Sequence, residues 1–317
     1  MAAPTNMETT TNMVGQREDL QNVIHRVAPE KTPFVTSIGR GKSNARYTDW
    51  QTEGLRAPDA TNAALEGNDY GNPNAPNRTA RVGNFNQIFE EKGGVSRTSE
   101  IVDKAGRQSE KKRQRLLKGI EMRRDMEARF IGNYASNDES GSTPRRSAGA
   151  LAWLETNTSR GTGGSDGGFS SGVVGAATNG TQRTLTEALF KVAHASAFDE
   201  GGEPNCAMMS STHKQIFDGF AGIAEIRVTP SGRQAQIMAG ADVYKGPFGD
   251  VQIKAHQYGL TRDLLLYDPE HFQVLFLDGY KTKEIGKNSD GDQFLMTAEA
   301  TLKCSNEKSH AVVADLT

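Results

Sequence analysis

The sequence has little cysteine, no long apolar run and no signal for export. Only Cys206 and Cys304 occur among 317 residues, so neither a disulfide framework nor a zinc-ligand spacing is present. No stretch approaches the roughly 18 apolar residues of a membrane span, and the polar start of the chain lacks the apolar core of a signal peptide. These absences exclude secreted and membrane classes. They predict a soluble protein that is made in the cytoplasm and has no membrane partner.

The chain also has no strong excess of either charge. Its net charge of −2 argues against a dedicated nucleic-acid-binding protein, although local basic clusters remain possible. Hydrophobic residues are 35% of the chain. Even with glycine counted and tyrosine left out, the apolar share is just under the about 45–50% of typical globular domains. The chain can bury a core, but part of it is expected to lie outside any core.

Motifs for catalysis or ligand binding are matched only in part. GRGKS (39–43) lacks a phosphate-loop glycine where Thr36 stands, and GFSSG (168–172) matches a hydrolase motif within a glycine-rich stretch where chance matches are common. Residues 288–299 approach calcium-loop spacing, but Gln293 replaces the required glycine. The six histidines form no cluster. We therefore predict no catalytic residue, no metal site and no cofactor.

The N-terminal region predicts a flexible arm followed by a short helix. Residues 1–17 are polar and rich in Thr and Asn. Residues 17–29 have helical spacing that ends at Pro29, and their apolar side chains share one face: Leu20, Val23, Ile24 and Val27.

A long hairpin is predicted next. Residues 45–55 and 80–91 have strand composition, and the 24 residues between them, 56–79, have little apolar material to pack. We expect this tip to project and to become ordered only on a neighbouring molecule. Its few anchors are Pro58, Leu65, Tyr70, Pro73 and Pro76.

Residues 99–135 predict one very long helix, about 55 Å at 1.5 Å per residue. Its middle carries no heptad seam, and three glycines allow a kink or break: Gly106, Gly119 and Gly132. Between residues 107 and 129 there are nine Lys or Arg and four Asp or Glu. This stretch is either a solvated helix with local ion pairs or a face that meets a polyanion. The possible DNA-facing residues are Lys111, Lys112, Arg113 and Arg115.

The remaining sequence combines helices and strands. A helix is predicted at 183–202, and strands follow through the last third, including an alternating strand within QFLMTAEATLKC. The fold class is therefore α+β.

Several segments, in order along almost the whole chain, resemble the major capsid proteins of tailed bacteriophages, the Hong Kong 97-like family. They include REDLQNVIHRVAPEKTPFVTSIGRGKS, DWQTEGLRAP, ARVGNFNQIF, VDKAGRQSE, GTQRTLTEAL, FAGIA, VYKGPFGDVQI, DPEHFQV and the C-terminal VADLT. The resemblance implies a Hong Kong 97-like fold in six parts. These are an N-terminal arm (1–40), an E-loop hairpin (41–96), a spine helix (97–135), a peripheral domain (136–215), an axial domain (216–285) and a C-terminal strand region that returns to the peripheral domain (286–317).

The resemblance also implies a structural rather than enzymatic function. The expected product is an icosahedral shell of pentamers and hexamers that is assembled in the host cytoplasm, encloses double-stranded DNA non-specifically and becomes the capsid of the virion. Portal, scaffolding or decoration proteins are further expected partners. The short arm that begins at Met1 predicts no fused scaffolding segment. The alternatives are a soluble adaptor with a long bridging helix and, less favoured, a hydrolase or nucleotide enzyme.

Overall fold

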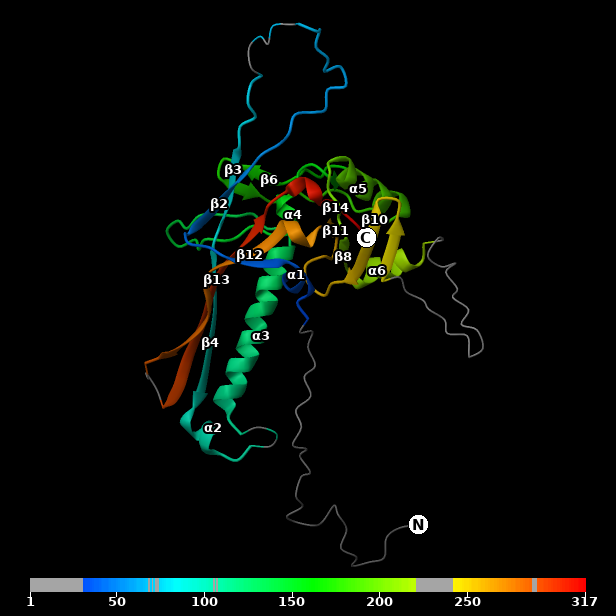
Figure 1. Cartoon of the computed structure of the whole chain (residues 1–317). Coiled ribbons are helices and arrows are strands. Elements are labelled where there is room, and N and C mark those ends of the chain that lie inside the picture. Colours follow the sequence, from blue (N-terminus) through cyan, green and yellow to red (C-terminus); the bar gives the residue numbers. More distant parts are fainter. Residues whose placement is uncertain are drawn as a thin grey trace, which may run out of the picture.

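The computed structural model describes residues 31–67, 69, 71, 74–104, 106, 108–220, 242–286 and 290–317. The helix predicted at 17–29 lies outside these ranges. The described chain has the expected α+β composition and forms two lobes from which a long hairpin projects (Figure 1).

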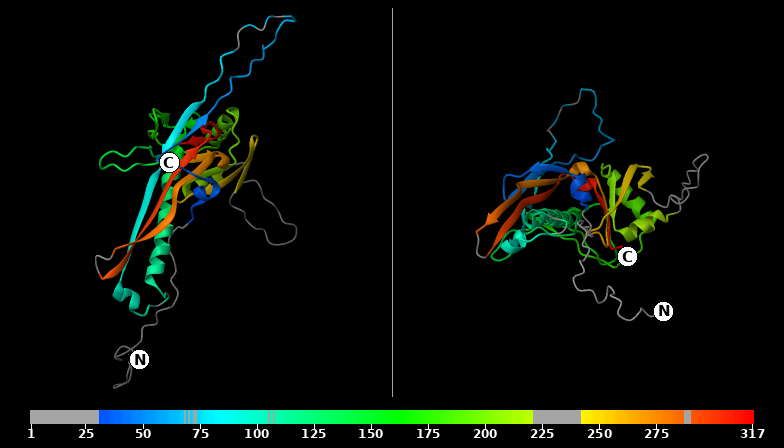
Figure 2. Two further views of the ribbon diagram at one scale, coloured as in Figure 1. Left: turned by 60° about the vertical axis from the view of Figure 1, so that its left-hand side comes forward. Right: turned by 90° about the horizontal axis from the view of Figure 1, so that it is seen from below.

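The first lobe is a four-stranded sheet covered by a long helix. Its strand order is β1 (Gly39–Lys42), β12 (Phe272–Ile285), β13 (Gly291–Cys304) and β4 (Gln87–Ser96). Strand β1 runs parallel to β12, and the other neighbours are antiparallel. Helix α3 (Glu110–Ile131) packs along β4 and β13, as Figure 1 and the left view of Figure 2 show. The alternation predicted in β13 is confirmed at Phe294, Ala298 and Leu302, which are buried.

The second lobe is a six-stranded sheet. Its strand order is β5 (Thr158–Ser159), β14 (Ala311–Val313), β11 (Leu264–Tyr267), β8 (Cys206–Met209), β10 (Gly249–Ala255) and β9 (Val243–Gly246). Helices α5 (Glu187–Asp199) and α6 (Ser211–Asp218) pack against this sheet.

The smaller elements of the molecule are α1 (Pro33–Ser37), α2 (Arg97–Ile101), α4 (Ala150–Trp153), the β6–β7 hairpin (Gly168–Ser170 and Val173–Gly175), and the 3-10 turns η1 (Pro269–His271) and η2 (Glu307–Ser309).

The central strands of this second sheet are buried on both faces. In β11, Leu265 and Tyr267 enter the core shared with α3, whereas Leu264 and Leu266 enter the core under α5 and α6. Successive side chains of a strand point to opposite faces, so a strand covered on both sides needs a continuous apolar run. This requirement explains LLLY in β11 and CAMM in β8.

The prediction of a single helix over 99–135 is wrong. The structure has two helices, α2 and α3, separated by residues 102–109, and α3 is 22 residues or about 33 Å long. Gly106 lies between the two helices and has a positive φ of 73°, a conformation that favours glycine. Ser109 is the N-cap of α3, and its side chain accepts a hydrogen bond from Lys112 N. Glu100 of α2 accepts from Glu110 N at 3.0 Å. No helix of the described ranges is both long and apolar enough to cross a membrane.

The expected domain boundaries do not follow the sheets. A boundary between residues 215 and 216 separates β8 from β10, which pair, and a boundary between 285 and 286 divides the β12–β13 hairpin. The reason is that the chain crosses between the two lobes, and sequence spacing does not reveal which distant strands pair. Which lobe is peripheral and which is axial in a shell stays a prediction.

A buried histidine in the second lobe gives a pH-dependent prediction. His310 is fully buried, it stacks on Phe272 with ring centroids 4.1 Å apart, and its Nδ1 accepts from Asp268 N. Burial, with His271 nearby, lowers the pKa of His310 to about 3. The folded chain therefore binds no proton here between pH 6.5 and 3, whereas the unfolded chain does. Stability is lost as the pH falls through this window.

We expect His310→Asn to remove this acid sensitivity, because the Asn oxygen can replace Nδ1 as acceptor. Between pH 7.5 and 5.5, the free energy of unfolding of the unchanged chain should fall by about 1.4 kcal/mol relative to the variant. Burial raises the pKa of Asp263 to about 6, which acts in the opposite direction in both proteins and cancels in the comparison. Denaturant unfolding at the two pH values measures the difference. An identical pH dependence in both proteins would contradict it.

Candidate functional site

The segments that resembled catalytic motifs form framework elements. GRGKS (39–43) contains strand β1, and GFSSG (168–172) contains β6 and the start of its turn to β7. Residues 291–299 belong to strand β13. Among the described residues, no group of three His, Cys, Asp or Glu side chains is placed to hold a metal ion. The features that distinguish this molecule are instead surfaces that are exposed to solvent on the single chain.

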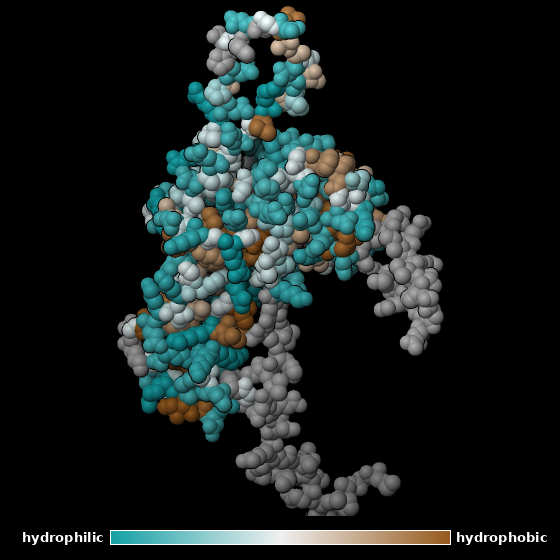
Figure 3. Space-filling view, in the orientation of Figure 1, coloured by the Kyte–Doolittle hydropathy of each residue, from teal (hydrophilic) through white to brown (hydrophobic). Residues whose placement is uncertain are grey.

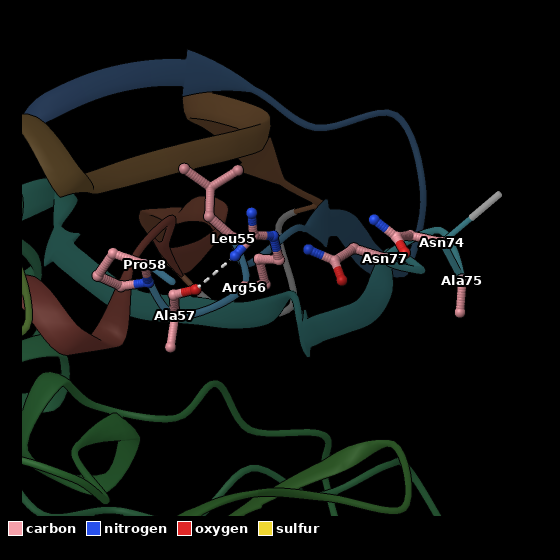
Figure 4. Close-up of a pocket in the computed structure, with 7 residues that line it drawn as sticks. All are labelled: Leu55, Arg56, Ala57, Pro58, Asn74, Ala75 and Asn77. Atoms are coloured by element: carbon pink, nitrogen blue, oxygen red, sulfur yellow. Dashed lines mark hydrogen bonds between the residues drawn. The ribbon is translucent and has the colours of Figure 1, made fainter. Parts of the chain in front are cut away.

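The most open of these surfaces is the tip of the long hairpin. Strands β2 (Tyr47–Thr52) and β3 (Ala80–Phe85) pair antiparallel, and beyond them every described residue from 53 to 79 is exposed. Asn77 Nδ2 donates to Gly54 O at 2.8 Å and ties the two arms together. Figure 3 shows the loop standing clear of the body, and Figure 4 shows the hollow between its arms, lined by Leu55, Arg56, Ala57, Pro58, Asn74, Ala75 and Asn77.

The predicted tip anchors that the structure describes pack on neither core of their own chain. Leu65 is 82% exposed, and Leu55, which the sequence analysis did not select, is 96% exposed. Pro58 and Pro76 are also exposed. Tyr70 and Pro73 lie outside the described residues. A loop of this length whose described apolar side chains face solvent does not offset its own ordering entropy by their burial within the chain.

The base of the hairpin is fixed by two buried asparagines that the sequence analysis missed. Asn84 Nδ2 donates to Leu302 O at 2.8 Å, and its Oδ1 accepts from Ala148 N at 2.9 Å. Asn86 Nδ2 donates to Ser43 Oγ at 2.9 Å. Both side chains are fully buried. Two asparagines among the apolar residues of VGNFNQIF, which also contains Gln87, were the available signal, because a buried amide must find partners.

The predicted DNA-facing residues are mostly paired with carboxylates. Lys111 Nζ lies 2.9 Å from oxygens of both Glu284 and Asp292, and these partners raise the pKa of Lys111. Arg115 also binds Glu284 at 2.9 Å. Arg113 binds Glu110 at 3.1 Å.

Lys112 is the exception among these four cations. It is exposed, and within the described ranges no carboxylate is paired with it. The solvated helix with local ion pairs, one of the two interpretations of the sequence, thus describes three of the four side chains.

A buried carboxylate joins α3 to the start of the described chain. Glu127 of α3 is fully buried, and its two oxygens accept from Phe34 N at 2.7 Å and Val35 N at 2.8 Å, at the beginning of α1. His256 Nε2 lies 2.7 Å from Glu127 Oε1. We call these contacts the Glu127 clamp. Because a helix N-terminus carries unpaired N–H groups and partial positive charge, a carboxylate is well suited to this position.

The second lobe carries an apolar hollow between α5 and the β9–β10 turn. It is lined by Lys191, Val192, His194, Ala195, Tyr244, Pro247 and Phe248. Val192 is 59% exposed, and Phe198, whose ring centroid lies 4.9 Å from that of Phe248, is 44% exposed. Apolar side chains are visible over this lobe in Figure 3. Grouped apolar exposure of this kind marks a contact surface.

Comparisons with known proteins point to one family. Residues 3–317 match the family of the SU10 major capsid protein. The chain is 25% identical over 345 residues to the major capsid protein of Escherichia phage Phieco32, and the match covers 99% of this chain and 97% of that protein.

Two solved structures have the same fold at low sequence identity. One is the capsid of a native GTA particle computed with C5 symmetry, with a TM-score of 0.58, 11% identity and 97% and 98% of the two chains covered. The other contains the major capsid and decoration proteins of phage G, with a TM-score of 0.52, 11% identity and 100% of both chains covered. The expected Hong Kong 97-like fold is confirmed.

Proposed function

This chain belongs to the SU10 major capsid protein family, and we propose that its copies assemble through pentamers and hexamers into a shell that encloses double-stranded DNA. As a phage major capsid protein it is structural rather than enzymatic, it forms the icosahedral head, and its place is the capsid of the virion. The observation that carries the mechanism is the hairpin tip, whose described residues 53–79 are all exposed on the single chain.

Exposed surfaces on different sides of the subunit suit contacts between neighbours. In a closed ring, one side of each subunit must meet a different side of the next. The hairpin tip extends from the lobe of α3, and the apolar hollow beside α5 lies on the other lobe (Figure 1). We infer that a neighbour buries each of these surfaces and that this burial provides the free energy that orders the tip.

An electron micrograph of the expressed and purified chain tests this function. The proposal predicts closed shells, or five- and six-membered capsomers, with a matching fast-sedimenting fraction. The alternative of a soluble adaptor protein predicts small particles of uniform size at every concentration. Uniform small particles, with or without added scaffolding protein, would contradict assembly into a shell.

The proposed contact of α3 with DNA now depends chiefly on Lys112. The ion pairs of Lys111, Arg113 and Arg115 already neutralise those cations, so they release few counterions when a phosphate approaches. Lys112 is exposed and can take a phosphate without breaking an ion pair. Binding of this kind does not depend on base sequence.

We expect Lys112→Gln to weaken the salt dependence of DNA binding, and Lys111→Gln serves as the matched control one residue away. If one phosphate contact is lost, the slope of log K against log salt should become shallower by about 0.9. The slope for Lys111→Gln should equal that of the unchanged chain. Titration of a labelled DNA duplex at several salt concentrations measures both. Equal slopes in all three proteins would remove Lys112 from the DNA contact.

A further inference from the structure

The exposed cations of α3 lie on one side of the helix. They are Lys112 and Arg123, which are within about 20° of each other around the helix axis at 100° per residue. Among the described residues, no carboxylate forms an ion pair with either of them. The one exposed carboxylate of α3, Asp125, lies on the opposite side, about 160° from Arg123. Helix α3 therefore presents its exposed positive charge on one side only.

Strand β1 adds two cations to this side of the first lobe. It is an edge strand, and its register with β12 places Arg40 beside Val274 and Lys42 beside Phe276. Both β12 partners pack in the core that α3 covers, so the two cations point to the α3 side of the sheet. Helix α1, which directly precedes β1, contacts α3 (Figure 1). Arg40 and Lys42 are exposed, and no carboxylate of the described ranges is paired with them.

Tyr280 of β12 connects the cations of β1 to those of α3. Its hydroxyl donates to Met126 Sδ at 3.1 Å, and its ring centroid is 6.0 Å from that of Phe276. Burial raises the pKa of Tyr280, and the charges of Arg123 and Arg40 act in the opposite direction, so both guanidinium groups lie near its hydroxyl. The Tyr280 side chain is 45% exposed. We call the following residues the α3–β1 face: Arg40, Lys42, Lys112, Arg123 and Tyr280.

We propose that the α3–β1 face binds the phosphates of double-stranded DNA, with Arg40 and Arg123 as its main contacts. This proposal rests on the function proposed above, in which the shell encloses DNA. Arginine suits the contact because its guanidinium group can bind two phosphate oxygens at once. Lys112 and Arg123 are about 16 Å apart along the helix axis, a length that spans about five phosphates of one DNA strand. Since no carboxylate has to be displaced, each contact can release counterions from the DNA.

The hairpin tip of a neighbouring subunit is the rival occupant of this face. Residues 57–77 contain three carboxylates and no Lys or Arg: Asp59, Glu66 and Asp69. DNA is favoured because it carries one negative charge per about 1.7 Å of its axis, a far higher density than three carboxylates spread over a loop. The two occupants predict different effects when the arginines are replaced, because only the tip contributes to contacts between subunits.

Replacement of both arginines tests the proposal. The variant Arg40→Gln with Arg123→Gln loses two positive charges, and the matched control Arg81→Gln with Arg97→Gln loses the same number. The control arginines are exposed, and each is paired with a carboxylate outside the face. A third variant, Arg40→Lys with Arg123→Lys, keeps the charge. Titration of a labelled DNA duplex with dissociated subunits at several salt concentrations measures binding, and electron microscopy measures shell formation.

The slope of log K against log salt should become shallower by about 1.8 in the double Gln variant of the face, because two contacts are lost at about 0.9 each. The control and the double Lys variant should keep the slope of the unchanged chain, and all four proteins should form shells.

An unchanged slope in the double Gln variant of the face, an equal reduction in the control, or no binding by the unchanged chain would overturn the DNA contact. These results would leave shell formation, and hence the proposed function, intact. Loss of shells in the variant but not in the control would assign the face to a neighbouring subunit and would also overturn the proposal. Failure of the unchanged chain to form shells would contradict the proposed function itself.

Discussion

A chain that lacks residues 60–77 is expected to fold as a subunit and to fail to form stable shells. The deletion keeps β2, β3 and the buried base of the hairpin around Asn84 and Asn86. The described residues that it removes are all exposed, and none of them belongs to either core. Thermal unfolding of the dissociated subunit should therefore change little, whereas sedimentation should show loss of the shell fraction. Normal shells from this variant would show that the tip contacts no neighbour.

A single substitution in the tip should have the same effect in weaker form. Leu65→Ser removes an apolar side chain whose burial on a neighbour would contribute roughly 1.5–3 kcal/mol per subunit. Ala64→Ser is the matched control, because it adds the same hydroxyl in the same exposed loop. We expect Leu65→Ser shells to dissociate at lower denaturant concentration than Ala64→Ser shells. Equal midpoints would mean that Leu65 stays exposed in the shell.

Glu127→Ala is expected to destabilise the subunit by about 3–5 kcal/mol, since loss of one member of a buried, hydrogen-bonded pair leaves its partners without an acceptor. The unpaired groups would be Phe34 N, Val35 N and the His256 ring. Glu121→Ala is the matched control on the same helix. Glu121 is 42% exposed and paired with Lys118, so its loss should cost at most about 1 kcal/mol.

Denaturant unfolding of the two variants measures this difference, and limited trypsin digestion after Lys31 adds a local readout. Release of α1 in Glu127→Ala should speed cleavage at Lys31, whereas Glu121→Ala should be cleaved at the rate of the unchanged chain. Equal losses of stability in the two variants would show that the Glu127 clamp contributes no more than a surface ion pair.

The elements that could be predicted from the sequence are those with a local cause. Alternation predicted β13, whose side chains Phe294, Ala298 and Leu302 are buried. The hairpin tip was identifiable because 24 residues with so little apolar content cannot pack on themselves. Helix boundaries were less predictable. Gly106 was visible as a weak point, but the sequence did not show that Glu100 and Ser109 would start a second helix.

The rest depends on contacts between residues far apart in the chain. Glu127 is a buried carboxylate of α3, and its partners, Phe34 and His256, are 93 and 129 residues away. Two cations of α3, Lys111 and Arg115, are paired with Glu284 and Asp292, which β12 and β13 bring to the helix from the last third of the chain. Composition showed that the stretch was basic, but only the sheet pairing shows that Lys111 and Arg115 already have carboxylate partners.

Hydrogen exchange at the hairpin tip tests most directly whether neighbours complete this subunit. Amides of the described residues in 60–77 should exchange rapidly in dissociated subunits, because the tip has no core of its own, and should be strongly protected in assembled shells. Amides of the buried strand β11 should be protected in both states and serve as the internal reference. Equal exchange at the tip in the two states would contradict the account, since it would show that assembly does not bury the surface that the single chain leaves open.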